Sequence, residues 1–330
     1  MRTNRRAFIR AGATLAAVAS SSLGVPAFAA PAAWPNRPLR IIVPFAPGGS
    51  SDVIARLIAK PLGDALGVNV VIENKTGANG IIGAAATAQA VDEHTLLLTD
   101  MSSLVISPLV TKDMPYKPQD LRGVTMLAYS PHLLVAHPSV AASNMNELVA
   151  LSKRSAINVA SSGSGSANHL GVVDIALTTG LKWQHVPFRG GAAAIGDTMA
   201  GNTQLCLNGM LATLPLVQSG RLKVIGVSKR TRMALLADVP TLAEQGVTGF
   251  ESGTYQGVAV AASMPKAIAE RLSVELIRAI RAPEMRARLV GAGAEVMTST
   301  PKETTDFLAA EAKRWASVIQ RAGTQLEGNV

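Results

Sequence analysis

The sequence predicts an α/β fold in two lobes. Short β-branched or apolar runs alternate with segments of helical periodicity, which is the order expected of parallel strands with helices on their faces. Several runs end in turns rich in glycine and serine. About 300 residues remain after an N-terminal export signal, and a chain of that length exceeds one ordinary hydrophobic core.

The stretch of residues 39–52 predicts a strand, a tight glycine turn and the start of a helix. Gly48 and Gly49 have no Cβ to block a ligand, and the first N–H groups of a helix have no partners within it. Such a turn suits a carboxylate or a phosphate. A plain connecting turn capped by Ser50 or Ser51 explains the same pattern.

The elements that follow continue this alternation. Apolar spacing predicts a helix over 53–66, in which Pro61 is expected to cause a kink or a new start. Strands are expected at 69–73 and 95–99, with a helix at 81–91 between them. Parallel strands present ligand sites at their carboxyl ends, so one edge of the sheet is predicted to carry the turns at 46–51, 75–80 and 100–103.

A proline-rich region with strands at 123–128 and 133–137 predicts a crossing between the lobes. A second alternating series follows, with strands expected at 157–160, 183–187, 205–208 and 224–227 and helices at 148–153, 170–179, 193–200 and 211–219. The turn at 161–169 is rich in serine and glycine, so it also suits a carboxylate or a phosphate for the reasons given for Gly48. Each lobe is therefore predicted to present glycine-rich turns at one edge.

The C-terminal part predicts a strand at 255–261 and then helices. Thr300 and Glu303 form a capping box, and the helix after it buries a stripe that includes Trp315. Proline suits the first position of a helix, and the sequence places it there at Pro265, Pro283 and Pro301.

Residues 1–29 predict a cleaved export signal. Four arginines without an acid precede a short apolar tract, and Ala27-Phe28-Ala29 fits a cleavage site. The paired Arg5-Arg6 resembles a twin-arginine signal, although a Sec signal also begins with basic residues. Later apolar stretches fall short of a membrane span. The localisation expected from these features is the periplasm.

The charge balance argues against a nucleic-acid partner. The formal charge is +9, and removing the four arginines of the signal reduces the excess to five. The densest basic cluster, residues 229–232, has no interleaved aromatic residue and is expected to be a solvated turn. The mild positive excess slightly favours an anionic ligand.

The sequence offers little support for metal or catalytic chemistry. Cys206 lies in an apolar run and is expected to be a small core residue. His132 and His137 would point to opposite faces of a strand and are expected at the surface or its boundary. Residues 162–166 do not read Gly-x-Ser-x-Gly, and Asn168 replaces the third glycine of a dinucleotide fingerprint. We therefore expect no catalytic residue, metal or cofactor, with an exported nucleotide-dependent enzyme as an alternative.

Several segments together resemble the Bug or TctC family of extracytoplasmic solute receptors of tripartite tricarboxylate transporters. The segments occur in the family's order: Pro-Phe-Ala-Pro-Gly-Gly-Ser-Ser-Asp at 44–52 with Arg56, Glu-Asn-Lys-Thr-Gly-Ala-Asn-Gly at 73–80, Gly-Ser-Gly-Ser at 163–166 with His169, and Pro-Phe-Arg-Gly-Gly at 187–191. Residues 240–246 and the closing helix with Trp315 are also similar. The resemblance covers nearly all of the chain after the signal.

This resemblance implies a type II periplasmic binding protein with a ligand cleft between two α/β lobes. The first lobe would contain residues 30–103 and 228–330, and the second would contain residues 104–227. Backbone amides and hydroxyls of the edge turns would hold a carboxylate, which carries the following residues into the candidate site: Gly48, Gly49, Ser50, Ser162, Ser164, Gly165, Ser166, His169, Gly190, Gly191, Ala192 and Tyr255.

Three of the residues in this region leave choices open. Tyr255 stands where relatives commonly have tryptophan, so the cleft wall is expected to differ there. His169 suits either a donor to an anion or a simple helix cap. Arg189 suits either a charged contact to the ligand or a solvent-facing position.

The function implied by the resemblance is binding rather than catalysis. The expected protein is a monomeric periplasmic receptor that captures a small carboxylate, such as a di- or tricarboxylate or a related organic acid, and delivers it to membrane transporter subunits. A receptor that reports its ligand to a signalling system would have the same cleft and is the alternative within the binding class.

Overall fold

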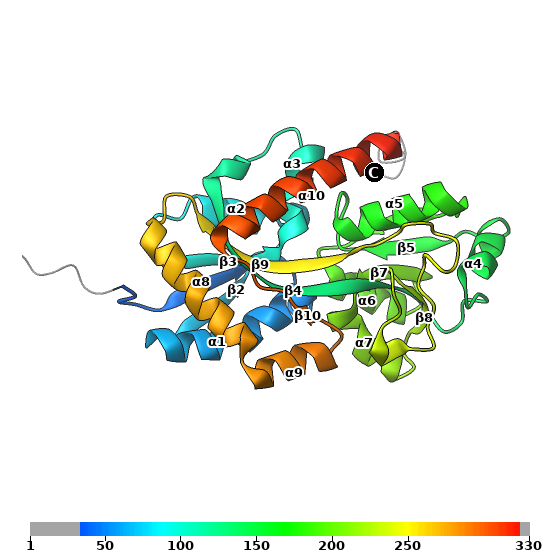
Figure 1. The fold of residues 1–330 in the computed structure, drawn as a ribbon. Coiled ribbons are helices and arrows are strands. Elements are labelled where there is room, and N and C mark those ends of the chain that lie inside the picture. The colour runs from blue at the N-terminus through cyan, green and yellow to red at the C-terminus, as the bar shows by residue number, and fades with distance from the viewer. Residues whose placement is uncertain (1–33, 324–330) are drawn as a thin grey trace, which may run out of the picture.

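The computed structural model describes residues 34–323, so the expected export signal at 1–29 lies outside the described part. Figure 1 shows two lobes side by side with strands β4 (Leu121–Ala136) and β9 (Gly253–Ala261) running through the centre. These two strands pair with each other in an antiparallel register. They form the connection on which the rest of both lobes is built.

The first lobe is built on parallel strands, as predicted, and their order in the sheet is β2-β1-β3. β1 is almost entirely buried because its β-branched residues are covered from both faces. β9 extends the sheet on the other side of β3 and runs antiparallel to it. The elements are β1 (Leu39–Val43), α1 (Ser50–Leu66), β2 (Val70–Asn74), α2 (Ile81–Ala88), β3 (Thr95–Asp100), α8 (Lys266–Arg281), α9 (Pro283–Gly291) and β10 (Glu295–Val296).

The second lobe repeats the arrangement with the parallel order β7-β5-β6. β4 closes this sheet by pairing antiparallel with both β7 and β8. The elements are α4 (Met145–Ser152), β5 (Asn158–Ser161), α5 (Ala167–Thr179), β6 (Gln184–Pro187), α6 (Gly191–Met199), β7 (Leu205–Gly209), α7 (Met210–Gln218) and β8 (Lys223–Val227). Cys206 is fully buried in this lobe, which confirms its expected place in the core.

The crossing differs from its prediction because the two expected strands form the single strand β4. Pro131 lies within that strand, opposite Gly253 of β9, and the next residue, His132, is already paired with Gly209 of β7. The proline thus stands where the strand changes partner, and a missing N–H costs least there. One continuous strand therefore belongs to both sheets.

Two further predictions about helices were incomplete. Residues 101–110, expected to begin as a turn, form helix α3 (Met101–Val110), whose N-cap is Asp100. Helix α1 continues through Pro61 to Leu66 and does not begin anew at the proline. Burial of the apolar face of α1, with Ile58 and Leu62 fully covered, outweighs one missing hydrogen bond.

Two of the three C-terminal prolines occupy the predicted first position of a helix. Pro283 and Pro301 occupy the first position of α9 and α10 (Pro301–Ala322), whereas Pro265 precedes α8 as its N-cap. The capping box is confirmed, since the Glu303 N–H donates to Thr300 Oγ1 at 3.2 Å and the Thr300 N–H to the Glu303 carboxylate at 2.7 Å.

Helix α10 lies across both lobes (Figure 1). Trp315 is 3% exposed and packs in one cluster with Ile106 of α3 and Leu170 of α5. An ion pair of 3.4 Å joins Arg321 to Asp174 of α5. The predicted buried stripe therefore exists, and it attaches the C-terminal part of α10 to the second lobe.

His132 is fully buried, which corrects its predicted place at the surface or its boundary. Its Nδ1 lies 2.8 Å from Ser252 Oγ and its Nε2 lies 3.1 Å from Thr254 Oγ1. Burial, assisted by the positive charge of Arg314, lowers its pKa to about 3. The sequence pattern could not show this, because the burial comes from segments more than a hundred residues away.

Candidate functional site

A cavity of about 40 Å³ lies where the edge turns of the two lobes meet. That volume is several times the ~10–15 Å³ that a single water requires, so it suits a group of a few heavy atoms. Its walls combine main-chain turns, small hydroxyl and amide side chains, and one carboxyl group. The lining residues are Phe45, Gly49, Ser50, Ser51, Asp100, Ser162, Asn168, Gly191, Asn208 and Thr254.

The first edge turn is held by the carboxylate of Asp52. This group accepts hydrogen bonds from the Gly48 N–H at 2.9 Å, from Arg56 at 2.9 and 3.0 Å, and from Asn74 at 2.9 Å. Asn74 also donates to the Phe45 carbonyl at 3.0 Å. Burial opposes ionisation of Asp52, but these donors outweigh it and lower the pKa of its carboxyl group.

The two glycines of this turn have separate roles. Gly48 has a φ of +85°, a conformation that other residues rarely adopt. Gly49 has an extended φ of −76° and ψ of 167° and serves as the N-cap of α1. Gly48 therefore shapes the turn, whereas Gly49 keeps the cavity wall free of a side chain.

Two helices direct uncapped N-termini toward the cavity. The N-caps of α1 and α6 are Gly49 and Gly190, and among the described residues no side chain caps either helix. A Cβ placed on Gly190 would lie 3.3 Å from the Ala46 backbone nitrogen, so the two turns approach each other closely. Unpaired N–H groups and the positive ends of helix dipoles favour a negative charge between them.

The second lobe adds a chain of polar side chains. Ser162 Oγ donates to Asn168 Oδ1 at 2.7 Å, and Asn168 Nδ2 donates to Asn208 Oδ1 at 3.0 Å and to the Leu207 carbonyl at 2.6 Å. Asn208 Nδ2 is buried and has no hydrogen-bond partner within residues 34–323. An unpaired buried donor is costly, so this N–H is available to an acceptor in the cavity.

Asp100 gives the cavity an acid. Its Oδ1 accepts from the Ser102 N–H at 3.0 Å and from Ser102 Oγ at 2.5 Å, which caps α3. Burial raises the pKa of Asp100 to about 6, although hydrogen bonds from Ser102 and the Tyr255 N–H oppose the rise. The negative charge of Glu311 adds to the effect of burial.

Of the residues predicted for the site, Gly49, Ser50, Ser162 and Gly191 line the cavity. Gly48 lies in the first edge turn, and Gly190 and Ala192 flank Gly191 at the start of α6; a Cβ on Gly48 would be 3.8 Å from Ala192 Cβ. These residues come from three separate parts of the sequence, at 48–50, 162 and 190–192. The structure therefore brings the glycine turns of both lobes together at one point.

The other residues predicted from the serine-rich loop, namely Ser164, Gly165, Ser166 and His169, are not among those that line the cavity. Ser164 is exposed, and Ser166 accepts the His169 N–H at 3.2 Å as the N-cap of α5. His169 is 1% exposed, and its Nδ1 accepts the Gly165 N–H at 3.1 Å. Its ring stacks on His185 with centroids 3.8 Å apart. These contacts fix the conformation of the loop.

Two further residues singled out from the sequence, Tyr255 and Arg189, have other surroundings. The Tyr255 ring packs between Tyr129 and Phe307, with centroid distances of 4.6 and 4.9 Å. Arg189 is exposed, which agrees with the solvent-facing alternative. Neither residue is among those that line the cavity.

The cavity contains polar residues that the sequence reasoning left out of the site, namely Ser51, Asp100, Asn168, Asn208 and Thr254. Asp100 belongs to the turn at 100–103 that the strand-end rule placed at this edge, although it was not selected as a site residue. Asn208 lies near the carboxyl end of β7, where the same rule could have identified it. Asn168 belongs to the serine-rich loop, in which only the hydroxyls and glycines were selected. Thr254 comes from β9 and has no such local signal.

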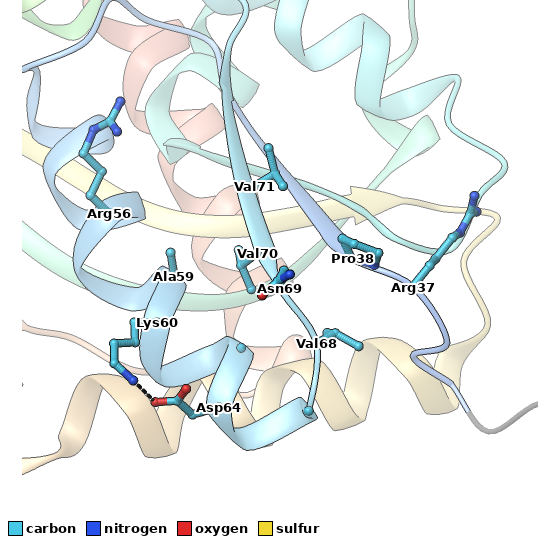
Figure 2. A pocket seen from close by; sticks show the side chains of 12 residues that line it. Arg37, Pro38, Arg56, Ala59, Lys60, Asp64, Val68, Asn69, Val70 and Val71 are labelled. Atoms are coloured by element: carbon cyan, nitrogen blue, oxygen red, sulfur yellow. Dashed lines mark hydrogen bonds and ion pairs between the residues drawn. The ribbon is translucent and has the colours of Figure 1, made fainter.

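Figure 2 shows a larger hollow, of about 900 Å³, along α1 and the edge strand β2. Charged side chains at its border include Arg37, Arg56 and the Lys60–Asp64 ion pair of 2.6 Å. Both members of that pair are well exposed to solvent. The hollow is an open groove on one lobe, whereas the smaller cavity has donors converging from both lobes.

The described part of the chain lacks two other kinds of site. Within it, no three histidine, cysteine, aspartate or glutamate side chains come close enough to hold a metal ion together. None of the helices from residue 34 to residue 323 has the length and apolar character needed to cross a membrane.

The fold and the cavity define a two-lobe type II periplasmic binding protein. Residues 54–324 match the model of the tripartite tricarboxylate transporter family receptors, TctC. The chain belongs to this family of solute receptors. It is 33% identical over 299 residues to BugT of Bordetella pertussis, which covers 89% of this chain and 92% of that protein.

Solved structures agree in fold. The Rhodopseudomonas palustris protein Rpa4515, solved with adipate, is 28% identical with a TM-score of 0.85, covering 88% of this chain and 98% of the other. MatC from the same organism was solved with bound malate and is 27% identical with a TM-score of 0.81. The match covers 86% of this chain and 99% of MatC.

Proposed function

We propose that this protein is a periplasmic receptor that binds a small carboxylate between its lobes and presents it to the membrane subunits of a tripartite tricarboxylate-type transporter. The observation that carries the proposal is the cavity between the uncapped N-termini of α1 and α6, with the unpaired N–H of Asn208 in its wall. Backbone and amide donors bind an anion without a formal positive charge.

The relatives support a carboxylate as the ligand. Adipate is bound in one similar structure and malate in another. Both are small dicarboxylic acids, so their carboxylate groups suit a site made of N–H and O–H donors. We infer that a di- or tricarboxylate or a related organic acid binds here, with Gly49, Ser50, Ser162 and Gly191 among its contacts.

Binding is proposed to involve a hinge motion. The cavity of about 40 Å³ has room for a few water-sized groups and is too small for an entire dicarboxylate. The lobes must therefore part to admit the ligand and close on it, with β4 and β9 as the crossing strands. We keep residues 30–103 and 228–330 as the proposed first lobe and 104–227 as the second.

The remaining features follow from a receptor role. The protein is proposed to act as a monomer, without a catalytic step and without nucleic acid. Residues 1–29 are proposed to direct export, with the twin-arginine route favoured by Arg5-Arg6. Fusion of residues 1–29 to a reporter tests the route, because export should stop in cells that lack the twin-arginine translocase and continue if the signal uses Sec.

A thermal-shift panel of mono-, di- and tricarboxylates tests the proposed function. A ligand at one hundred times its Kd adds about 2.7 kcal/mol to the free energy of unfolding, which corresponds to a rise in Tm of roughly 5 °C. Asn208→Asp places a negative charge where the unpaired donor lies and should remove the shift. Asn69→Asp, on the exposed side of the first lobe, should retain it. A folded protein that no carboxylate stabilises would contradict the proposal.

A further inference from the structure

Asp100 is an unusual component of a cavity for anions. It lines the same cavity as the uncapped start of α1 and the unpaired Asn208 N–H, and it is 8% exposed. Of its two carboxyl oxygens, Oδ1 accepts both hydrogen bonds from Ser102. A carboxylate that lay against Asp100 would bring two acceptors of like charge together in a site of low dielectric.

The contacts of Asp100 keep the ionised form accessible. The N-terminus of α3 favours a negative charge on its capping residue, Ser102 supplies two donors, and the Tyr255 N–H supplies a third. Burial and the facing Glu311 of α10 act against ionisation, and Tyr255 on β9 is the neighbouring titratable group. With a pKa of about 6, Asp100 is mostly ionised at pH 7.5 and mostly neutral at pH 5.

We propose that Asp100 selects ligands that carry a hydrogen-bond donor, an ammonium or hydroxyl group, in addition to their carboxylates. This inference rests on the proposed function and narrows its substrate class to amino acids and hydroxy acids rather than plain carboxylic acids. The donor of the ligand bonds to Asp100, while its carboxylate receives the N–H groups of the helix ends and Asn208. Acids without a donor would place their own negative charge beside the Asp100 carboxylate with no hydrogen bond between the two.

The physical reason is the cost of bringing two negatively charged acceptors together in a buried site with no donor between them. A site that contains a polar group for a specific hydrogen bond rejects analogues that lack the partner. A charged acceptor strengthens this effect, because it loses its hydration when the lobes close. The difference in affinity between donor-bearing and plain acids should therefore exceed what the added hydrogen bond alone provides.

Calorimetric titration with matched ligands tests the inference. The sets are succinate, malate and aspartate; glutarate, 2-hydroxyglutarate and glutamate; and benzoate with 4-hydroxybenzoate. At pH 7.5 the best donor-bearing member should bind at least about tenfold more tightly than its plain counterpart. At pH 5 this ratio should shrink as Asp100 becomes neutral.

Asp100→Asn is the diagnostic variant. Asparagine is also a good N-cap and retains an oxygen for the Ser102 N–H, so α3 should remain capped. The variant should bind plain acids more tightly, and its preference for donor-bearing acids should fall to within about threefold at both pH values. Asp92→Asn is the matched control, because Asp92 precedes the first residue of β3, Thr95, at the end of the strand opposite Asp100. This variant should keep the wild-type preference and its pH dependence.

The possible outcomes separate the two proposals. If no acid of any set binds to the folded wild-type protein, the proposed function and this inference both fail. If acids bind but plain members match donor-bearing ones at pH 7.5, or Asp100→Asn keeps the wild-type ratio, the receptor role stands and the inference is overturned. Tight binding of a plain acid with uptake of one proton would show that Asp100 donates as a neutral acid, which also overturns it.

Discussion

At the scale of single residues, the two adjacent glycines of one motif have different structural roles. The sequence presents Gly48 and Gly49 as one turn, but only Gly48 has a positive φ. Gly49 is extended, and a Cβ there would meet the Ala46 carbonyl at an ordinary 3.6 Å. Backbone conformation thus requires the first glycine, and the space for a ligand requires the second.

We expect Gly49→Leu to abolish carboxylate binding while the protein stays folded. The added side chain would occupy the cavity wall, and its cost as an N-cap is about 1 kcal/mol. Calorimetry would measure affinity and circular dichroism the melting temperature. Gly196→Leu on α6, where a Cβ meets open space, is the matched control and should bind normally. Unchanged affinity in Gly49→Leu would leave the glycine a purely structural role.

Asp100 and Asn208 supply the acid and the unpaired donor of the cavity, yet the sequence around them gave little indication of a binding site. Asp100 looked like the end of a strand, and Asn208 like the end of an apolar run. Their significance comes from burial and from which hydrogen bonds are filled. Neither property can be inferred from residue type, because both depend on neighbours that are distant in the sequence.

At the scale of elements, local patterns predicted most strands and helices but not how long each continues. β1, β2 and β3 lie close to their predicted places, since alternation and flanking turns are local properties. β4 was divided in two because Pro131 suggested a break. α3 was missed because its apolar residues follow β3 directly, and only Asp100 marks the boundary between them.

Helix α10 provides an element-scale prediction. Trp315→Ala should lower the free energy of unfolding by about 3–5 kcal/mol, because it removes a buried indole from the cluster that joins α3, α5 and α10. Urea unfolding measures the loss. Lys313→Ala, an exposed change two residues earlier, should alter stability by less than about 0.5 kcal/mol. Similar values for both variants would show that α10 contributes little to holding the lobes.

At the scale of the whole molecule, buried titratable groups predict how stability depends on pH. Burial lowers the pKa of His132 and of His169 to about 3, with Arg314 adding to the effect at His132 and His185 at His169. Between pH 6.5 and 4 the unfolded chain binds protons at these histidines that the folded protein does not. Their contribution to stability is therefore lost as the pH falls through this range.

Asp100 acts in the opposite direction. Its pKa rises on folding from 3.8 to about 6, so its favourable contribution is present below pH 4 and is lost as the pH rises through 6. Together the three groups take up about one net proton on unfolding between pH 6 and 4. The free energy of unfolding should then fall by about 1.4 kcal/mol per pH unit on acidification.

Urea unfolding across pH 4–7.5 measures this dependence. Asp100→Asn should make the decline on acidification about twice as steep and should raise stability at pH 7.5, because the cost of burying a charge disappears. A flat profile in the wild-type protein, or an unchanged slope in the variant, would mean that these groups are not buried as described.

The alternation of strands and helices, the glycine turns, the capping box and the family could all be predicted from the residues alone, because each is a pattern of neighbouring residues or a set of ordered motifs. Which turns meet, the burial of His132 and the position of Asp100 at the cavity became evident from the folded arrangement. Those facts depend on how β4 and β9 place one lobe against the other. Burial and the pairing of polar groups arise from such long-range contacts, so they became visible only in the folded chain.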